Sequence, residues 1–230
     1  MEIYDTEEEQ VAAIKRWWKE NGTSAISGVV IGVVIILGWN FWQSKQLEQA
    51  NQSSALYSQL LESINNKNNA STQKITERIS AEYGTTAYAT YAALLLAKTK
   101  VQQGDLEAAK SILEKQMQSA DSTVLRNIAR LRLIKLLYAT AQYEQGLQLI
   151  AEVDQSSIQG FSASYDELKG DLYVALDRLG EARTAYQSAL RSGNSSPLLQ
   201  FKLDDITAAE IIESNTASPK AVAEKLAVEE

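Results

Sequence analysis

Three short stretches with a common pattern decide the fold: QGDLEAA at residues 103–109, AQYEQG at residues 141–146 and DRLGEA at residues 177–182. Each stretch ends one helix-forming segment with turn residues and begins another. Each also closes on a small residue of the second segment, at Ala109, Gly146 and Ala182, which are 37 and 36 positions apart. The spacing predicts an internal repeat whose unit is a pair of helices joined by a short turn.

Tetratricopeptide repeats are the repeat class that this pattern fits. They have a period of about 34 residues and place small residues where paired helices cross closely. The third unit follows the small and large positions of the consensus best, at Gly170, Tyr173, Ala182, Tyr186 and Ala189. Arg130 and Asp166 stand where a large apolar residue is usual, and Pro197 comes later than a closing proline would. We therefore expect divergent repeats with slightly longer connections.

Two further helices are expected before these units. The first carries apolar side chains at helical spacing, at Tyr57, Leu60, Leu61 and Ile64. The second is expected to begin near Thr72 and to end at Gly84, because glycine is favoured just past a helix C-terminus. After the units, residues 195–197 (Ser-Ser-Pro) predict the start of one more helix.

That last helix, LLQFKLDDITAAEII at residues 198–212, is expected to cover the open end of the last repeat. Its apolar stripe comprises Leu199, Leu203 and Ile206, and a terminal repeat would otherwise leave its core face in water. Residues 214–230 are expected to form a disordered or weakly helical tail.

Composition supports an all-α domain and argues against catalysis. Outside residues 25–42 there are no β-branched runs. The chain contains no Cys and no His, which excludes thiol nucleophiles, Cys/His zinc sites and histidine general bases. Asp204 and Asp205 do not form a facing carboxylate pair, since adjacent helical residues point about 100° apart. We predict no catalytic, cofactor-binding or metal-binding residue.

One apolar stretch precedes the repeats: AISGVVIGVVIILGWNFW at residues 25–42. The 24 residues from Asn21 to Ser44 carry no charge, which is enough helix to cross a bilayer. All four tryptophans lie near the two ends of this stretch and resemble the aromatic belts of a membrane span. A buried helix of a soluble protein does not explain the belts. A cleaved signal peptide does not fit the acidic start or the bulky residues after the stretch.

The basic residues around this span predict its orientation. Lys15, Arg16 and Lys19 precede it, whereas only Lys45 follows closely. Because cytoplasmic flanks are enriched in Lys and Arg, the N-terminus is expected in the cytoplasm. The predicted organisation is a cytoplasmic segment, a transmembrane helix, a repeat domain on the far side of the membrane, as in a periplasm, and a flexible tail, at residues 1–20, 21–44, 45–213 and 214–230.

Two parts of the membrane-proximal sequence are candidates for contacts. Gly28 and Gly32 form a GxxxG motif, which lets a second transmembrane helix approach closely. The alternative is that they are glycines of a lipid-facing helix. Val11, Ile14, Trp17 and Trp18 share one helix face, which suits either a helix lying on the membrane surface or a contact with a cytoplasmic partner.

Repeat solenoids present an extended inner surface to protein partners. Aligning the units with the consensus places seven residues along this inner wall: Tyr91, Lys98, Gln102, Lys135, Tyr138, Asp171 and Val174. Some of them could instead serve packing within the repeats. The mixture of Tyr, apolar and oppositely charged residues suits large protein partners or unfolded chains, and it lacks the Lys/Asn set that clamps a C-terminal carboxylate.

The sequence resembles the YfgM-like ancillary SecYEG translocon subunits of Gram-negative bacteria. The resemblance rests on TEEEQVAAIKRWWKENG at residues 6–22, on the divergent repeats and on PLLQFKLDDI at residues 197–206. It implies an inner-membrane protein with a periplasmic repeat domain. It also implies association with the SecYEG translocon and with PpiD, a membrane-anchored periplasmic chaperone, in assisting secreted polypeptides as they emerge. The resemblance brings no catalytic motif.

Two other function classes remain open from the sequence. The same architecture suits an envelope scaffold that tethers cell-wall or division proteins, or a membrane-anchored enzyme, although the latter lacks the usual catalytic groups. The net charge of −7 argues against nucleic acid as a partner. The expected partners are therefore proteins and membrane lipid.

Overall fold

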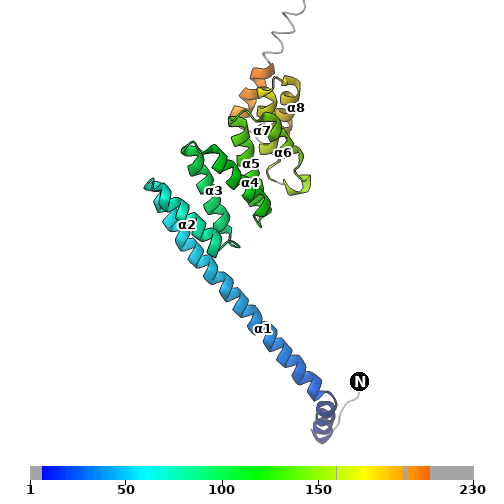
Figure 1. The fold of residues 1–230 in the computed structure, drawn as a ribbon. Coiled ribbons are helices and arrows are strands. Elements are labelled where there is room, and N and C mark those ends of the chain that lie inside the picture. The colour runs from blue at the N-terminus through cyan, green and yellow to red at the C-terminus, as the bar shows by residue number, and fades with distance from the viewer. Residues whose placement is uncertain (1–6, 159, 194–195, 208–230) are drawn as a thin grey trace, which may run out of the picture. The chain divides into compact units, whose positions relative to one another are not determined.

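The computed structural model describes residues 7–158, 160–193 and 196–207, and within them the protein is helical and contains no strand (Figure 1). The chain divides into two compact units, Met1–Ala55 and Leu56–Glu230. The prediction of an all-α protein is confirmed. The expected tail at residues 214–230 and the expected end of the last helix at residues 208–212 lie outside the described residues.

The described part of the first unit is a single helix. It belongs to α1 (Glu7–Asn65), which continues into the second unit. Every large apolar side chain between Val29 and Leu37 is exposed. Among the described residues, α1 is the one helix long and apolar enough to cross a membrane.

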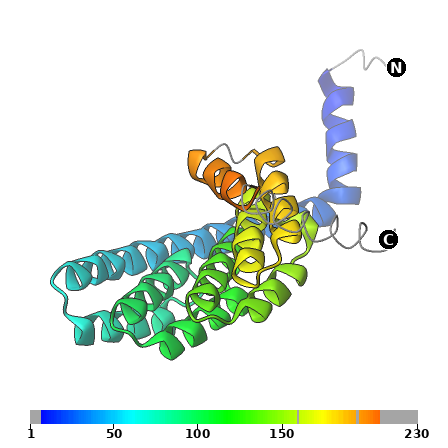
Figure 2. The ribbon, with the colours of Figure 1, turned by 90° about the horizontal axis from the view of Figure 1, so that it is seen from above.

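The second unit begins with the last ten residues of α1 and continues as an ordered series of helices. They are α2 (Asn69–Glu82), α3 (Ala87–Gln102), α4 (Leu106–Ser119), α5 (Thr123–Ala139), α6 (Tyr143–Ala151), the 3₁₀ helix η1 (Gln155–Ser157), α7 (Ser162–Ala175) and α8 (Leu179–Arg191). Residues 197–207 form a further helix. From α2 onward each α-helix packs against the next one in the chain, and Figure 2 shows them stacked in chain order from cyan to yellow.

The three predicted helix pairs are present as α3/α4, α5/α6 and α7/α8, and their turns share one geometry. Gly104, Ala141 and Asp177 have φ of 80°, 57° and 59°. In each turn the next amide donates to the carbonyl five residues back; one example is Gln142 N to Leu137 O at 2.8 Å. This is the left-handed helix C-cap that usually employs glycine.

A fourth turn of the same kind joins α1 to α2. Lys67 has a φ of 53°, and the Asn68 amide donates to Ser63 O at 2.9 Å. The four left-handed residues are spaced by 37, 37 and 36 positions. The end of α1 and α2 therefore form a first helix pair, in which the buried Thr72 occupies the place of Ala109, Gly146 and Ala182.

The second helix begins three residues before the expected Thr72, and Gly84 directly follows its C-cap, Tyr83, without the expected left-handed conformation. It begins at Asn69 because the side chain of Asn68 caps it, accepting a hydrogen bond from Ser71 N at 3.0 Å. Gly84 is not a left-handed cap, since its φ lies outside that region. Glycine is required there because a Cβ would lie 2.8 Å from the carbonyl oxygen of Ser80.

The core divides into four buried clusters along the array. Small residues allow close packing: a Cβ on Gly146 would lie 3.0 Å from Leu172, and one on Gly170 would lie 2.2 Å from the Tyr186 ring. In the last cluster, Leu199 and Ile206 are buried against α8, with Leu203 packed beside them. The prediction that this stripe covers the last repeat is confirmed.

Candidate functional site

The seven residues of the predicted inner wall lie on the first helices of the pairs α3/α4, α5/α6 and α7/α8. Tyr91, Lys98 and Gln102 are on α3, Lys135 and Tyr138 are on α5, and Asp171 and Val174 are on α7. All except Asp171 are exposed. Exposure alone does not distinguish a binding residue from a solvated one, so the surroundings of each decide what it could do.

The structure brings Lys98 and Lys135 together at a groove of about 470 Å³ between α3 and α5. Apolar side chains make up most of its lining, at Leu94, Ala97, Val101, Leu113, Leu136 and Ala139. The other lining residues are Lys98, Lys135 and Arg132, and Arg132 donates from Nη1 to Leu94 O at 3.1 Å across the groove. The groove can accept an apolar side chain and place a negative charge beside it.

Sequence reasoning missed Arg132, although it lies three residues before Lys135 on the same helix face. The consensus alignment picked only selected positions of each helix. Arg132 is exposed, as are Lys98 and Lys135. In the part of the chain that the structure describes, none of these three cations has a carboxylate within ion-pair distance.

Three tyrosines gather beside this groove. The ring centroids of Tyr57, Tyr88 and Tyr91 lie 5.5 to 6.2 Å apart. Burial raises the pKa of Tyr57, and the nearby positive charge of Arg132 acts in the opposite direction. Tyr91 was predicted for the inner wall, whereas Tyr57 and Tyr88 were not. The cluster offers flat apolar surface next to the cations, which suits contact with a polypeptide.

Asp171 differs from the other six because its carboxylate already has partners. It accepts hydrogen bonds from Tyr186 Oη at 2.8 Å and from Lys202 Nζ at 2.7 Å, and Lys202 also contacts Glu167 at 2.9 Å. Burial and the bond to Asp171 raise the pKa of Tyr186. Burial alone would lower the pKa of Lys202, but the hydrogen bonds and charges of Asp171 and Glu167 outweigh it and raise that pKa.

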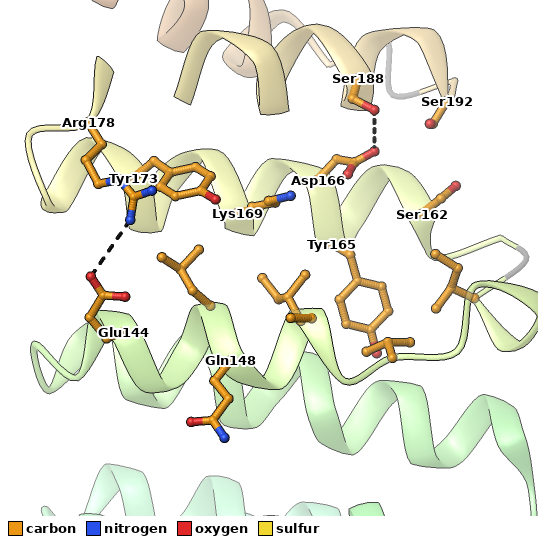
Figure 3. Close-up of a pocket in the computed structure, with 15 residues that line it drawn as sticks. Glu144, Gln148, Ser162, Tyr165, Asp166, Lys169, Tyr173, Arg178, Ser188 and Ser192 are labelled. Carbon is orange, nitrogen blue, oxygen red and sulfur yellow. Dashed lines mark hydrogen bonds and ion pairs between the residues drawn. The ribbon is translucent and has the colours of Figure 1, made fainter. Parts of the chain in front are cut away.

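A second, larger cleft of about 790 Å³ lies among α6, α7 and α8 (Figure 3). Its polar groups are largely engaged with one another. Ser188 donates to Asp166 at 2.8 Å, Arg178 lies 3.9 Å from Glu144, and the Arg178 guanidinium stacks 4.6 Å from the centre of the Tyr173 ring. These contacts join neighbouring helices. Asp166, which stands where the repeat consensus has a large apolar residue, links α7 to α8 by accepting the hydrogen bond from Ser188.

The apolar part of α1 carries the other predicted site. Nothing lies within 4 Å of a Cβ built on Gly28 or Gly32. The rings of Trp17 and Trp18 lie 6.3 Å apart at one end of the apolar segment, and those of Trp39 and Trp42 lie 5.3 Å apart at the other. This segment could accept a second helix along the glycines.

Comparison with known proteins covers nearly the whole chain. A family model described as a tetratricopeptide repeat-like domain matches residues 15–208. A protein of Haemophilus influenzae is 32% identical over 206 residues, covering 88% of this chain and 99% of that protein. Proteins of Escherichia coli and Neisseria gonorrhoeae are 27% and 24% identical, covering 90% and 87% of this chain and 100% and 97% of their own lengths.

Each of these three relatives is named an ancillary SecYEG translocon subunit. The matched region includes the apolar part of α1, the helix pairs and the stretch PLLQFKLDDI at residues 197–206. The chain therefore belongs to the tetratricopeptide repeat-like family of ancillary SecYEG translocon subunits.

Proposed function

We propose that this chain is an inner-membrane accessory of the Sec translocon, which binds proteins through its helix pairs and has no catalytic activity. The observation that carries the proposal is the match to translocon subunits over almost their entire length. Supporting it, the groove between α3 and α5 combines apolar surface with three exposed cations, a combination that suits protein binding.

The proposed topology follows from the basic flanks of the span. Residues 1–20 lie in the cytoplasm, residues 21–44 cross the membrane in contact with lipid, and residues 45–213 lie in the periplasm with the tail 214–230. Lys15, Arg16 and Lys19 outnumber Lys45. Reporter fusions after residue 70 should work only with periplasmic reporters. Activity of a cytoplasmic reporter at this position would overturn the topology.

The proposed partners divide between the two units. Gly28 and Gly32 pack against a transmembrane helix of SecYEG or of a PpiD-like chaperone. The inner wall, at Tyr91, Lys98, Gln102, Lys135, Tyr138, Asp171 and Val174, binds the periplasmic part of a PpiD-like chaperone or an emerging secreted polypeptide. Within this wall, Asp171 acts by holding Lys202 and Tyr186 in place.

Detergent co-purification tests this division. Gly28→Ile with Gly32→Ile should weaken recovery of SecYEG, since close backbone approach is lost and membrane helix contacts contribute only about 1–2 kcal/mol each. The matched control is Gly38→Ile, which adds the same side chain in the same apolar segment on another face of the helix. Equal loss with the control would show a general insertion defect and contradict the glycine interface.

The inner wall is tested in intact membranes with photo-crosslinkers at Tyr91 and Tyr138. We expect crosslinks to the chaperone or to secreted chains, and we expect Lys135→Glu to reduce them. Crosslinks to cell-wall or division proteins, with translocon subunits absent from the purified complex, would favour an envelope scaffold and contradict the proposed function.

A further inference from the structure

The groove between α3 and α5 carries a local charge opposite to that of the whole chain. The protein has a net charge of −7, yet three of the nine residues lining the groove are cations and none is acidic. Lys98 and Lys135 come from different helices, and Arg132 is held in the same groove by its bond to Leu94 O. Such a concentration of like charge is unfavourable in isolation and is relieved by an anionic partner.

The apolar side chains that line the groove limit which kinds of anion can bind there. Leu94, Ala97 and Leu136 are buried, while Val101 is 42% exposed and open to contact. The tyrosine cluster lies at the same side of α3, and the charge of Arg132 reaches Tyr57. An inorganic anion would leave this apolar surface in water. Nucleic acid is disfavoured by the overall acidity of the chain.

We infer that this groove binds a polypeptide segment in which apolar side chains are flanked by internal aspartate or glutamate. The apolar side chain packs on the exposed Val101, and the carboxylates lie beside Lys98, Arg132 and Lys135. This inference rests on the proposed function, since it specifies the chemistry of the segment that the inner wall receives. The occupant is a segment of another protein and not a free C-terminus.

Fluorescence anisotropy tests the inference with full-length protein in nanodiscs and a short labelled peptide of alternating leucine and glutamate, both ends blocked. Empty nanodiscs provide the background. Replacing every glutamate of the peptide by glutamine should weaken binding at least tenfold, and replacing it by lysine should abolish binding. Added salt should weaken binding of the glutamate peptide, because partly exposed charges are screened.

On the protein, Lys98→Gln with Lys135→Gln should weaken binding of the glutamate peptide at least tenfold and flatten its salt dependence. The matched control is Lys74→Gln with Lys115→Gln, which removes two exposed lysines on α2 and α4 and changes the net charge equally. Val101→Ser should weaken binding without changing the salt dependence. Equal loss in the control, or equal binding of the lysine peptide, would overturn the inference.

Two results separate this inference from the proposed function. If the protein co-purifies with SecYEG but does not bind the glutamate peptide, the groove inference is wrong and the function stands. If it binds the peptide through Lys98 and Lys135 but is never recovered with translocon subunits, the function is wrong and the groove inference stands. A peptide that binds only when its C-terminus is free would also overturn the inference.

Discussion

The groove between α3 and α5 and the surface of α7 lie at corresponding positions of the helix pairs. They differ in whether their charged side chains have partners within the protein. In the groove, Lys98 and Lys135 have no carboxylate partner among the described residues, and apolar surface is open. On α7, the last helix supplies Lys202, which pairs with Asp171 and Glu167. The same repeat position therefore holds an exposed lysine in two units and a carboxylate bonded to the last helix in another.

The largest expected effect is on the stability of the last helix pair, α7/α8. Gly170→Val should destabilise the domain by about 2–4 kcal/mol, since overpacking at a helix crossing forces the Tyr186 ring out of its place. Thermal unfolding followed by circular dichroism measures it. The matched control is Gly180→Ala on α8, where a Cβ meets nothing within 4 Å. A control as unstable as the variant would show that the close approach at Gly170 is not the cause.

Lys202→Met tests whether the pairing on α7 is structural. We expect a loss of about 1–2 kcal/mol at neutral pH, because the part-buried Asp171 loses the Lys202 ammonium and Glu167 loses its contact with the same group. Denaturant unfolding measures the loss. An unchanged midpoint would mean that the last helix is held by its apolar stripe alone.

The same contact predicts a dependence on alkaline pH. The pKa of Lys202 is raised in the folded protein, so its contribution is fully present below the ordinary pKa of 10.5 and is lost as pH rises through the folded-state value. The stability difference between wild type and Lys202→Met should therefore shrink above about pH 10.5. A difference that stays constant up to the highest measurable pH would contradict a charged contact.

Ala141→Gly should stabilise the domain by about 0.5–1 kcal/mol, since Ala141 is held in the left-handed region that glycine adopts without strain. Gly104 already has glycine at the equivalent turn, so Gly104→Ala should cost a similar amount. Both are measured as shifts in unfolding temperature. Shifts of the same sign in both variants would show that the turns are not equivalent.

The smallest effect is expected at the open groove. Lys98→Gln and Lys135→Gln should change the free energy of unfolding by less than about 0.5 kcal/mol, because both lysines are exposed and neither forms an ion pair with a described residue. A loss as large as that of Lys202→Met would mean that the groove, like α7, is part of the fold.

Much of this architecture could be read from the sequence because it is periodic. The corners at Gln103, Ala141 and Asp177 and the small residues that follow them determined the three helix pairs, and the stripe from Leu199 to Ile206 determined the last helix. The two helices before them were expected, but not as a repeat unit. Thr72 stands at the place of Ala109, Gly146 and Ala182, so the first pair lacks the alanine or glycine that marks the others.

The candidate site could be predicted less completely from the sequence. A repeat consensus states which positions face the inner wall, but it does not state which of them find partners. Lys202 bonds to Asp171 from 31 positions away, and nothing in the period predicts that contact. Arg132 was missed because its role depends on the Leu94 carbonyl of the preceding pair.

The packing of each helix mainly against its neighbours in the chain has a consequence for how the domain folds. The contacts that close each turn, such as Gln142 N to Leu137 O, join residues close in sequence. Chains dominated by local contacts fold quickly, and solenoids can begin folding at one unit and propagate. The helix pairs can therefore form one after another, as successive parts of the chain become free to fold. The contact between Lys202 and Asp171 forms later, because Lys202 follows the last helix pair in the chain.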